Sequence, residues 1–253
     1  MRYCILASGS KGNSTFLETQ YARILVDVGL SAKKIEDRLR KLDVDPQSID
    51  SIVLTHAHTD HVRGVGQFAF KHKIPIYAHP DTLDEITQRL KPDQKIEPWQ
   101  ESFYIKDVSF TPFNLSHDCY PTFGYLIQEN SKTLAICTDL GVATESLKEY
   151  LQKANVLILE SNHDQKMLLN GTYPWYLKER IASRVGHLSN LEAGELLLSI
   201  YTANLEKVIL AHLSEDNNTS QRARNTVLEI VGNHLESYID VIEQRKMSDI
   251  FQM

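Results

Sequence analysis

The richest concentration of reactive side chains in the sequence is His56-Ala57-His58-Thr59-Asp60-His61, where four groups that can bind a metal ion fall within six residues. The chain has ten histidines in 253 residues, so three in this short stretch are more than a polar surface loop explains. Neutral imidazoles together with a carboxylate suit zinc, manganese or iron better than calcium. A tight loop can direct His56 and His58 at one ion and Asp60 with His61 at a second. The stretch therefore predicts a site for divalent metal ions.

Three further candidate ligands, His117, Asp139 and His212, each stand where an apolar run ends. A single histidine or aspartate at such a place is more often structural than functional. Together with the upstream cluster, however, the three complete a set of imidazole and carboxylate donors for two ions. In this prediction His56, His58 and His117 hold one ion, Asp60, His61 and His212 hold the other, and Asp139 bridges the two.

Strands must bring these scattered residues to one edge of a sheet. Continuous or alternating apolar runs predict strands, and apolar residues three or four positions apart predict helices. No linker, internal repeat or low-complexity segment interrupts the pattern, which predicts one domain over residues 1–253 with two sheets packed face to face and helices outside. The expected strands include 2–7, 14–18, 24–28, 49–55, 75–79, 103–115, 122–128, 133–137, 156–160 and 207–212, and the expected helices 31–42, 62–71, 81–90, 146–152, 174–184, 190–203 and 220–235.

Composition and charge narrow the class of protein. A hydrophobic fraction of 42% and a charged fraction of 24% are typical of a globular chain. No apolar run approaches the roughly 18–20 residues that span a bilayer, so we expect no membrane partner. Three scattered cysteines, Cys4, Cys119 and Cys137, predict no disulfide framework and therefore a cytoplasmic location. A net charge of −6 disfavours binding of nucleic acid by bulk charge alone, although a bound metal can supply local positive charge.

The motif HAHTDH, followed in order by His117, Asp139 and His212, resembles the metallo-β-lactamase-fold hydrolases over nearly the whole chain. The upstream run ILVDVG, which places Asp27 before Gly29, is similar to the first motif of that family. The resemblance implies an α/β fold, the αββα sandwich of two mixed sheets flanked by helices, with a dinuclear metal site at one edge. It also implies that Asp27 supports the ligands from behind. True β-lactamases match poorly, because they lack the last histidine of HAHTDH and often have cysteine where Asp139 stands.

Two downstream motifs resemble one branch of this superfamily. Glu160 in ESNHD and His187 in GHLSN are similar to a pair in the metallo-β-lactamase-fold nucleases that passes a proton to the leaving group. With the opening LASGSKGNST and the run HLSEDNN, they most resemble the YycJ/WalJ-like bacterial group. That resemblance implies a 5′→3′ exonuclease on DNA, with RNA left open, and Asp60, Glu160 and His187 as catalytic residues. Only 26 residues separate Glu160 from His187, so no insert domain fits there, and whether His163 of ESNHD enters the site is left open.

Other functions share the same ligands, so fold and metal site alone do not decide the substrate. A small-molecule hydrolase, such as a glutathione thioesterase of the glyoxalase II type, would use the same set, but ESNHD and GHLSN favour the nuclease. A regulatory protein with a residual metal site is disfavoured because the ligand set is intact. For a phosphodiester, two ions activate water and offset charge on phosphorus, and a Glu–His pair protonates the leaving oxygen. The sequence leaves open whether the ions are zinc, manganese or iron, and what the oligomeric state is.

Overall fold

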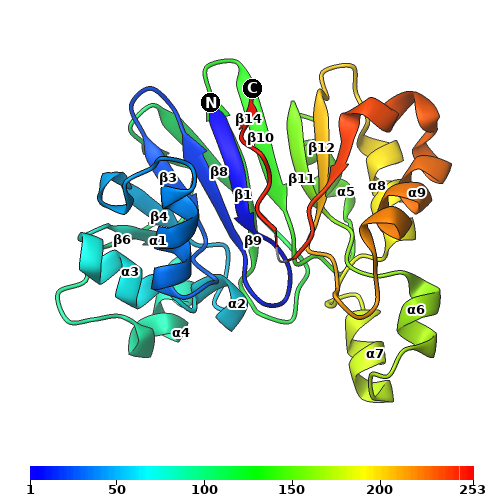
Figure 1. The fold of residues 1–253 in the computed structure, drawn as a ribbon, viewed down its shortest axis with the longest axis horizontal. Coiled ribbons are helices and arrows are strands. Elements are labelled where there is room, and N and C mark those ends of the chain that lie inside the picture. Colours follow the sequence, from blue (N-terminus) through cyan, green and yellow to red (C-terminus); the bar gives the residue numbers. More distant parts are fainter. Residues whose placement is uncertain (245) are drawn as a thin grey trace.

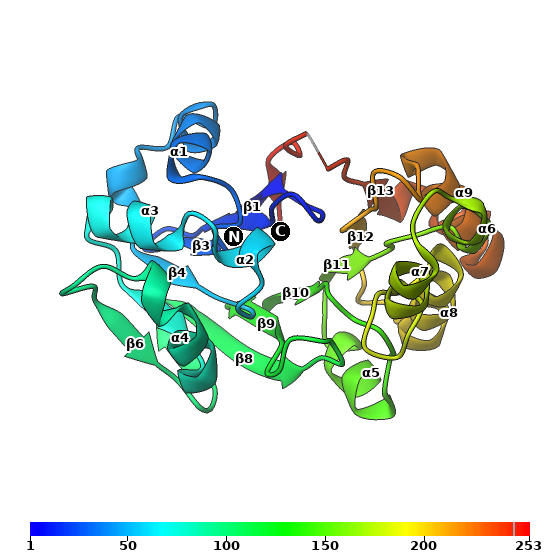
Figure 2. The ribbon, with the colours of Figure 1, turned by 90° about the horizontal axis from the view of Figure 1, so that it is seen from below.

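Two seven-stranded mixed sheets lie face to face in the computed structural model, which describes residues 1–244 and 246–253 (Figure 1). Helices cover the outer face of each sheet, which confirms the expected αββα sandwich (Figure 2). The first sheet runs in the order β14 (Phe251–Gln252), β1 (Arg2–Ala7), β2 (Ser14–Glu18), β3 (Arg23–Val26), β4 (Ser51–Val53), β5 (Ile76–Ala78) and β6 (Ile96–Pro98). The second runs in the order β13 (Ile239–Val241), β12 (Lys207–Ala211), β11 (Val156–Glu160), β10 (Lys132–Cys137), β9 (Phe123–Glu129), β8 (Val108–Asn114) and β7 (Phe103–Ile105).

Three apolar layers hold the sandwich together. The inner layer lies between the two sheets and includes Tyr3, Phe110 and Tyr125, all buried. Removal of such apolar area from water is the main favourable contribution to folding. Each outer face has its own buried apolar cluster under a set of helices. The helices are α1 (Ala32–Arg40), α3 (Val65–His72) and α4 (Pro80–Ile86) on the first sheet, and α5 (Glu145–Leu151), α8 (Asn190–Ile200) and α9 (Ser220–Val231) on the second.

The helix predicted over residues 62–71 is present as α3 (Val65–His72), although it begins later than expected. A separate short helix that was not predicted, α2 (Thr59–Val62), ends before Gly64, and α3 begins after it. Gly64 packs against the loop that follows β3: its N–H donates to the carbonyl of Val28 at 2.9 Å, and a Cβ there would lie 2.2 Å from the carbonyl oxygen of Leu30. The apolar spacing continues across this break, so the pattern alone does not reveal it. The break holds the HAHTDH loop against the end of β3.

Two short helices, α6 (Gln165–Asn170) and α7 (Trp175–Ile181), project at the lower edge of the molecule in Figure 1, away from both termini. Among the described residues, no helix is long and apolar enough to cross a bilayer. Cys4, Cys119 and Cys137 are all buried as free thiols. The remaining helical segments are 3₁₀ turns at Pro46–Ser48, Thr87–Arg89 and Asn233–Tyr238.

Glu36 of α1 links the helices that cover the first sheet. Its carboxylate accepts hydrogen bonds from Lys71 at 2.7 Å and Arg40 at 3.2 Å, and it lies 3.1 Å from Nε2 of His72. Burial alone would raise its pKa, but these partners outweigh burial and lower the pKa of Glu36 to about 2. We predict that Glu36→Gln destabilises the protein near neutral pH by about 1 kcal/mol, because ion pairs with exposed cations are worth little more.

The lowered pKa sets the pH dependence of this effect. The unfolded chain protonates Glu36 near the ordinary pKa of 4.5, whereas the folded chain protonates it near 2. The stability lost in Glu36→Gln should therefore be fully present above about pH 4.5 and should vanish as the pH falls toward 2. Denaturant unfolding at a series of pH values measures the free energy of unfolding of wild type and Glu36→Gln. Asp37→Asn is the control, because Asp37 is exposed and lies 3.4 Å from Arg40. If the difference in unfolding free energy between wild type and Glu36→Gln did not change with pH, the stabilising role assigned to the ionised Glu36 would be wrong.

Candidate metal centre

The residues predicted to carry chemistry meet where parallel strands end. Strands β3 and β4 are parallel neighbours in the first sheet, and β10, β11 and β12 are parallel neighbours in the second. Their carboxyl ends therefore lie at one edge of each sheet, and α2, α6 and α7 mark that edge in Figure 1. The predicted residues follow the strands closely: Asp27 after β3, His56 after β4, Asp139 after β10, Glu160 at the end of β11 and His212 after β12.

Three of these residues leave their strands in a left-handed backbone conformation. The φ angles are 63° at Asp27, 64° at Asp139 and 57° at His212. This region is uncommon for residues other than glycine and clusters at functional sites, where surrounding contacts stabilise it. Ser14 donates its hydroxyl to the carbonyl of Asp27 at 2.7 Å, and the N–H of His212 donates to Ser8 Oγ at 2.7 Å. Ser8, which follows β1, and Ser14, which begins β2, thus support two of the three strained residues.

His56, His58 and His117 form one group, with a ring nitrogen of each within 4.8 Å of the others. Nδ1 of His117 lies 3.1 Å from the carbonyl oxygen of Gly186, to which it can donate, and this leaves Nε2 as the ligand atom. That Nε2 is 3.3 Å from Nδ1 of His58. Nδ1 of His56 contacts Thr55 Oγ1 at 3.0 Å, whereas its buried Nε2 has no hydrogen-bond partner in the described part of the chain. These are the three residues predicted to hold one ion.

Asp60, His61 and His212 form a second group, again with ligand atoms within 4.8 Å of one another. Nδ1 of His61 lies 2.7 Å from Oδ2 of Asp27, and Nδ1 of His212 lies 2.7 Å from Oε1 of Glu160. A carboxylate at Nδ1 fixes the tautomer, so that Nε2 presents its lone pair to the site. Oδ2 of Asp60 lies 3.8 Å from Nε2 of His61 and 3.9 Å from Nε2 of His212. These are the three residues predicted to hold the second ion, and Asp27 contacts one of them, His61.

Asp139 lies between the two groups. Its Oδ1 is 3.7 Å from Nε2 of His117 in the first group and 3.5 Å from Nε2 of His212 in the second. Its Oδ2 is 3.1 Å from Nε2 of His61. Asp139 is only 1% exposed, so neighbouring side chains surround it in place of water. This position suits the bridging role predicted for its carboxylate.

Three residues near the ligands were not singled out as site residues from the sequence. Thr55 donates its N–H and its hydroxyl to Asp27, each at 2.9 Å. Nδ2 of Asn13 lies 3.2 Å from Oδ2 of Asp60 and 2.8 Å from Nε2 of His61. Oδ1 of Asp118 lies 3.4 Å from Nε2 of both His58 and His117. The only sequence signal for Thr55 and Asp118 is that each adjoins a predicted ligand.

Glu160 connects the second group to His187. Its Oε1 is 2.8 Å from Nδ1 of His187 as well as 2.7 Å from Nδ1 of His212. Its Oε2 accepts the backbone N–H groups of Leu140 and Leu188 at 2.9 and 3.2 Å. Glu160 is fully buried and its oxygens are occupied, so it orients the two imidazoles and does not face the pocket. Burial would lower the pKa of His187, but the carboxylate of Glu160 outweighs burial and raises it.

A pocket of about 240 Å³ opens onto the ligands at this edge. His58, Asp60, His117, Asp139, His187 and His212 line its inner side, and Leu177, Arg180 and Ile181 of α7 line the opposite side. The ring of His187 lies 5.1 Å from that of His117 and 5.2 Å from that of His212, between the two ligand groups. His163 does not line this pocket.

The chemistry of this donor set fits divalent metal ions. Burial and the neighbouring imidazoles hold the pKa of His56 well below its usual value, so its ring is neutral and its lone pair is available. Burial opposes ionisation of Asp139, but the imidazoles of His212 and His61 outweigh it and hold the pKa of Asp139 well below the usual range. The buried Nε2 atoms of His56 and His212 have no hydrogen-bond partner among the described residues. Because an unpartnered buried polar atom is costly, a bound cation would supply the partner that these two atoms lack.

Comparison with known proteins gives the family. Residues 22–213 match the β-lactamase superfamily domain, and the chain belongs to this family, the metallo-β-lactamase-fold hydrolases. The match confirms the resemblance seen in the sequence.

Relatives in two bacteria cover most of the chain. The exodeoxyribonuclease YycJ of Bacillus anthracis is 34% identical over 235 residues, which are 91% of this chain and 89% of the relative. The exodeoxyribonuclease WalJ of Streptococcus pneumoniae serotype 2 is 35% identical over 234 residues, 90% of this chain and 87% of the relative. Among solved structures, the metallo-β-lactamase-fold protein YhfI of Bacillus subtilis superposes with a TM-score of 0.74 over 98% of both chains at 16% identity. That last similarity shows the fold alone.

Proposed function

We propose that the protein is a dinuclear metal-dependent phosphodiesterase that degrades DNA as a 5′→3′ exonuclease. The observation that carries this proposal is the position of His187, which Glu160 holds inside the metal pocket between the two ligand groups. A thioesterase releases a good leaving group, a thiolate, and has little need for such a residue. A phosphodiesterase expels a poor leaving group, an alkoxide, which requires a proton. The names of the two bacterial relatives support DNA as the substrate.

Each side chain of the site has a separate role in the proposed reaction. His56, His58 and His117 would hold one ion, Asp60, His61 and His212 the other, with Asp139 shared between them. When bound, the ions would lower the pKa of water and stabilise negative charge on the phosphorus. His187 has Nδ1 on Glu160, so Nε2 is the nitrogen that can give a proton to the leaving oxygen. Glu160 does not touch the substrate but keeps that imidazole in the required orientation and tautomer.

Exposed arginines stand around the metal loop of an otherwise acidic protein. Arg63 donates to the carbonyl of Lys11 at 3.2 Å, and Arg89 donates to Thr59 Oγ1 at 2.9 Å. Arg180 of α7 lines the metal pocket itself, where it pairs with Asp118. Contacts from arginine to phosphates fix the position of a strand without reading its sequence. We assign these arginines to the phosphates that flank the scissile bond.

Degradation of a DNA duplex labelled at one 5′ end tests the proposal. With zinc, manganese or iron supplied in turn, the labelled end should be released first, as mononucleotides or short fragments, and a chelator should stop the reaction. Single-stranded RNA of the same sequence and a glutathione thioester serve as competing substrates. Efficient thioester hydrolysis with DNA and RNA left intact would eliminate the nuclease. Release of the label only at late times would reverse the proposed direction.

A further inference from the structure

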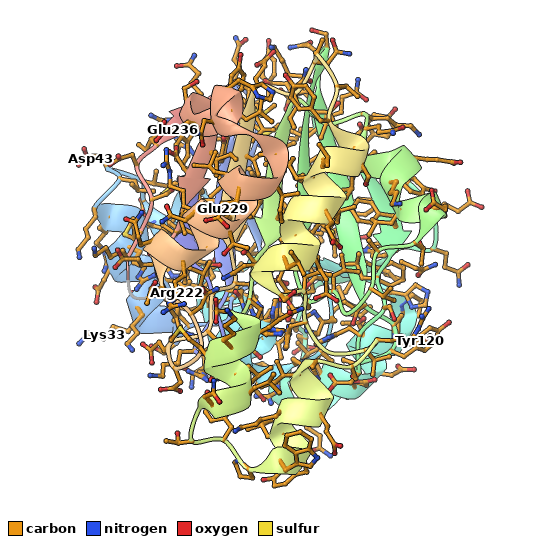
Figure 3. All side chains as sticks on the ribbon, turned by 90° about the vertical axis from the view of Figure 1, so that its right-hand side faces the viewer. Lys33, Asp43, Tyr120, Arg222, Glu229 and Glu236 are labelled. Carbon is orange, nitrogen blue, oxygen red and sulfur yellow. The ribbon has the colours of Figure 1, made fainter. Side chains whose placement is uncertain are left out.

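A second pocket lies on the other side of helix α7 from the metal pocket. Its volume is about 320 Å³, and its walls come from α6, α7 and the first turn of α8. Figure 3 shows α6 and α7, in yellow-green, as a pair at the lower end of the molecule beneath α8 and α9. The pocket is largely apolar and is lined by His163, Gln165, Leu168, Leu169, Trp175, Lys178, Glu179, Ala182 and Glu192.

His163 gives this pocket a polar group without a partner. The residue is 2% exposed, and its Nδ1 is buried with no hydrogen-bond partner among the residues described. Burial lowers the pKa of His163, so the imidazole is neutral at pH 7 and offers one donor and one acceptor. A buried ring nitrogen without a partner is costly, and a ligand that reached Nδ1 from the pocket would remove that cost. His163 therefore brings one unsatisfied hydrogen-bonding nitrogen to the wall of this pocket.

Trp175 gives the same pocket an aromatic wall. The indole stands at the first position of α7 and is 62% exposed, which is unusual for a large apolar ring. Leu168 of α6 lies across the pocket and is buried. An exposed aromatic ring, an apolar wall and the unpartnered nitrogen of His163 suit a flat heterocycle that stacks on the indole.

The two faces of α7 connect this pocket to the metal centre. Leu177, Arg180 and Ile181 face the metal pocket. Trp175, Lys178 and Glu179, with Ala182 directly after the helix, face the second pocket. These two sets follow the spacing of three and four residues that defines the sides of a helix. None of the seven residues of α7 is buried. A helix is about 10 Å across, so a strand held at the metal pocket has its next nucleotides within reach of the second pocket.

We propose that the second pocket binds a nucleobase of the substrate strand, stacked on Trp175 and hydrogen-bonded to His163. The inference rests on the proposed function, because it places a nucleic acid strand at the metal centre. Flat heterocycles with both donors and acceptors on their edge match a neutral imidazole, whichever tautomer it takes. Every base has a stacking face, so this contact adds affinity without selecting a sequence.

Tryptophan fluorescence of the metal-loaded enzyme tests binding directly. Trp99 is the other of two tryptophans and is 5% exposed, so quenching by an added ligand reports on Trp175. Deoxyadenosine and thymidine, which have no phosphate to bind at the metal centre, should quench it in a saturable way. His163→Leu should weaken that binding about three- to tenfold, as expected for one lost hydrogen bond. Tyr176→Ala should leave it unchanged, since Tyr176 is 72% exposed on the same helix but does not line the pocket.

Quenching that is absent, does not saturate, or is unaffected by His163→Leu would overturn the site. Deoxynucleosides are not cleaved, so the fluorescence result does not depend on whether the protein is a nuclease. A wild-type enzyme that binds deoxyadenosine but leaves DNA intact would defeat the proposed function and keep the pocket.

Kinetics then separate recognition from a structural effect on α7. Trp175→Ala should lower kcat/KM on a natural single-stranded oligonucleotide about tenfold, the usual worth of one stacked base. The same variant should be unchanged on an oligomer of abasic nucleotides and on bis(4-nitrophenyl) phosphate, which have no nucleobase. Tyr176→Ala should match wild type on all three substrates. Equal losses of Trp175→Ala on all three would mean that Trp175 only supports the helix, and the nucleobase site would be rejected.

Discussion

Asp139→Ala should empty both metal sites together and reduce hydrolysis of any phosphodiester by at least about 10³-fold. The carboxylate of Asp139 lies between the two ligand groups, within 3.7 Å of His117 on one side and 3.5 Å of His212 on the other. Its removal leaves each group with three donors and leaves adjacent cations without the negative charge between them. Because an ion at such a site is worth several kcal/mol to the transition state, loss of both accounts for this factor.

Asp27→Ala is the matched control for Asp139→Ala. Both aspartates are buried and both have a left-handed φ, so the two variants perturb the backbone similarly. Asp27, however, contacts Thr55 and Nδ1 of His61 and reaches the metal site only through them. Its loss should weaken metal binding about 10- to 100-fold, as for other residues that orient a ligand.

Elemental analysis after purification without chelator gives the number of ions, and assays with bis(4-nitrophenyl) phosphate give the rate. Wild type should hold two ions per chain under metal-replete conditions. One ion or none in wild type, or equal and complete loss of metal in both variants, would contradict the arrangement of the ligands.

The location of the site was predictable because the sequence itself marks the edge of the sheets. Apolar runs predict where strands end, and a histidine or aspartate directly after such a run must lie at the end of a strand. When strands are parallel, their carboxyl ends meet at the same edge. Asp139 and His212 were placed in this way, and β10 and β12 end at Cys137 and Ala211 in the structure.

The parts of the fold that were missed have no local signal. Strands β6, β13 and β14 have two or three residues each, too few to show a period, and they exist because they pair with neighbouring strands. The six residues of α6 are likewise too short for an apolar stripe to emerge. The break at Gly64 follows from a close approach to a loop that is distant in sequence.

Contacts within the site also depend on residues that are distant in the sequence. The sequence links Glu160 to His187 through the resemblance to nucleases, but it does not reveal that the same oxygen also holds His212. Asn13 contacts Asp60 and His61 across 47 and 48 positions of the chain. A residue type can be read from the sequence, but a contact of this kind needs the folded sheets.

Glu160 contacts both His187 and His212, so Glu160→Ala and His187→Ala should differ in metal content, although the sequence alone would treat them as equivalent. His187→Ala removes a group that lines the pocket but leaves His212 on its carboxylate, so both metal ions should stay bound. Glu160→Ala releases His212 as well as His187, so it should lose metal in addition to rate. Metal content therefore distinguishes the residue that gives the proton from the residue that positions it.

On DNA, His187→Ala should lose about 10²–10⁴-fold in rate, the usual contribution of a general acid. Bis(4-nitrophenyl) phosphate releases nitrophenolate, which leaves without a proton, so the same variant should lose less than tenfold on it. DNA binding should be unaffected, because the arginines and the metal ligands remain in place. Single-turnover rates on both substrates, with metal content and Kd for DNA measured on the same preparation, give the comparison. If His187→Ala slowed both substrates equally, His187 would act in binding or structure, and the assignment of the leaving-group proton to its Nε2 would be wrong.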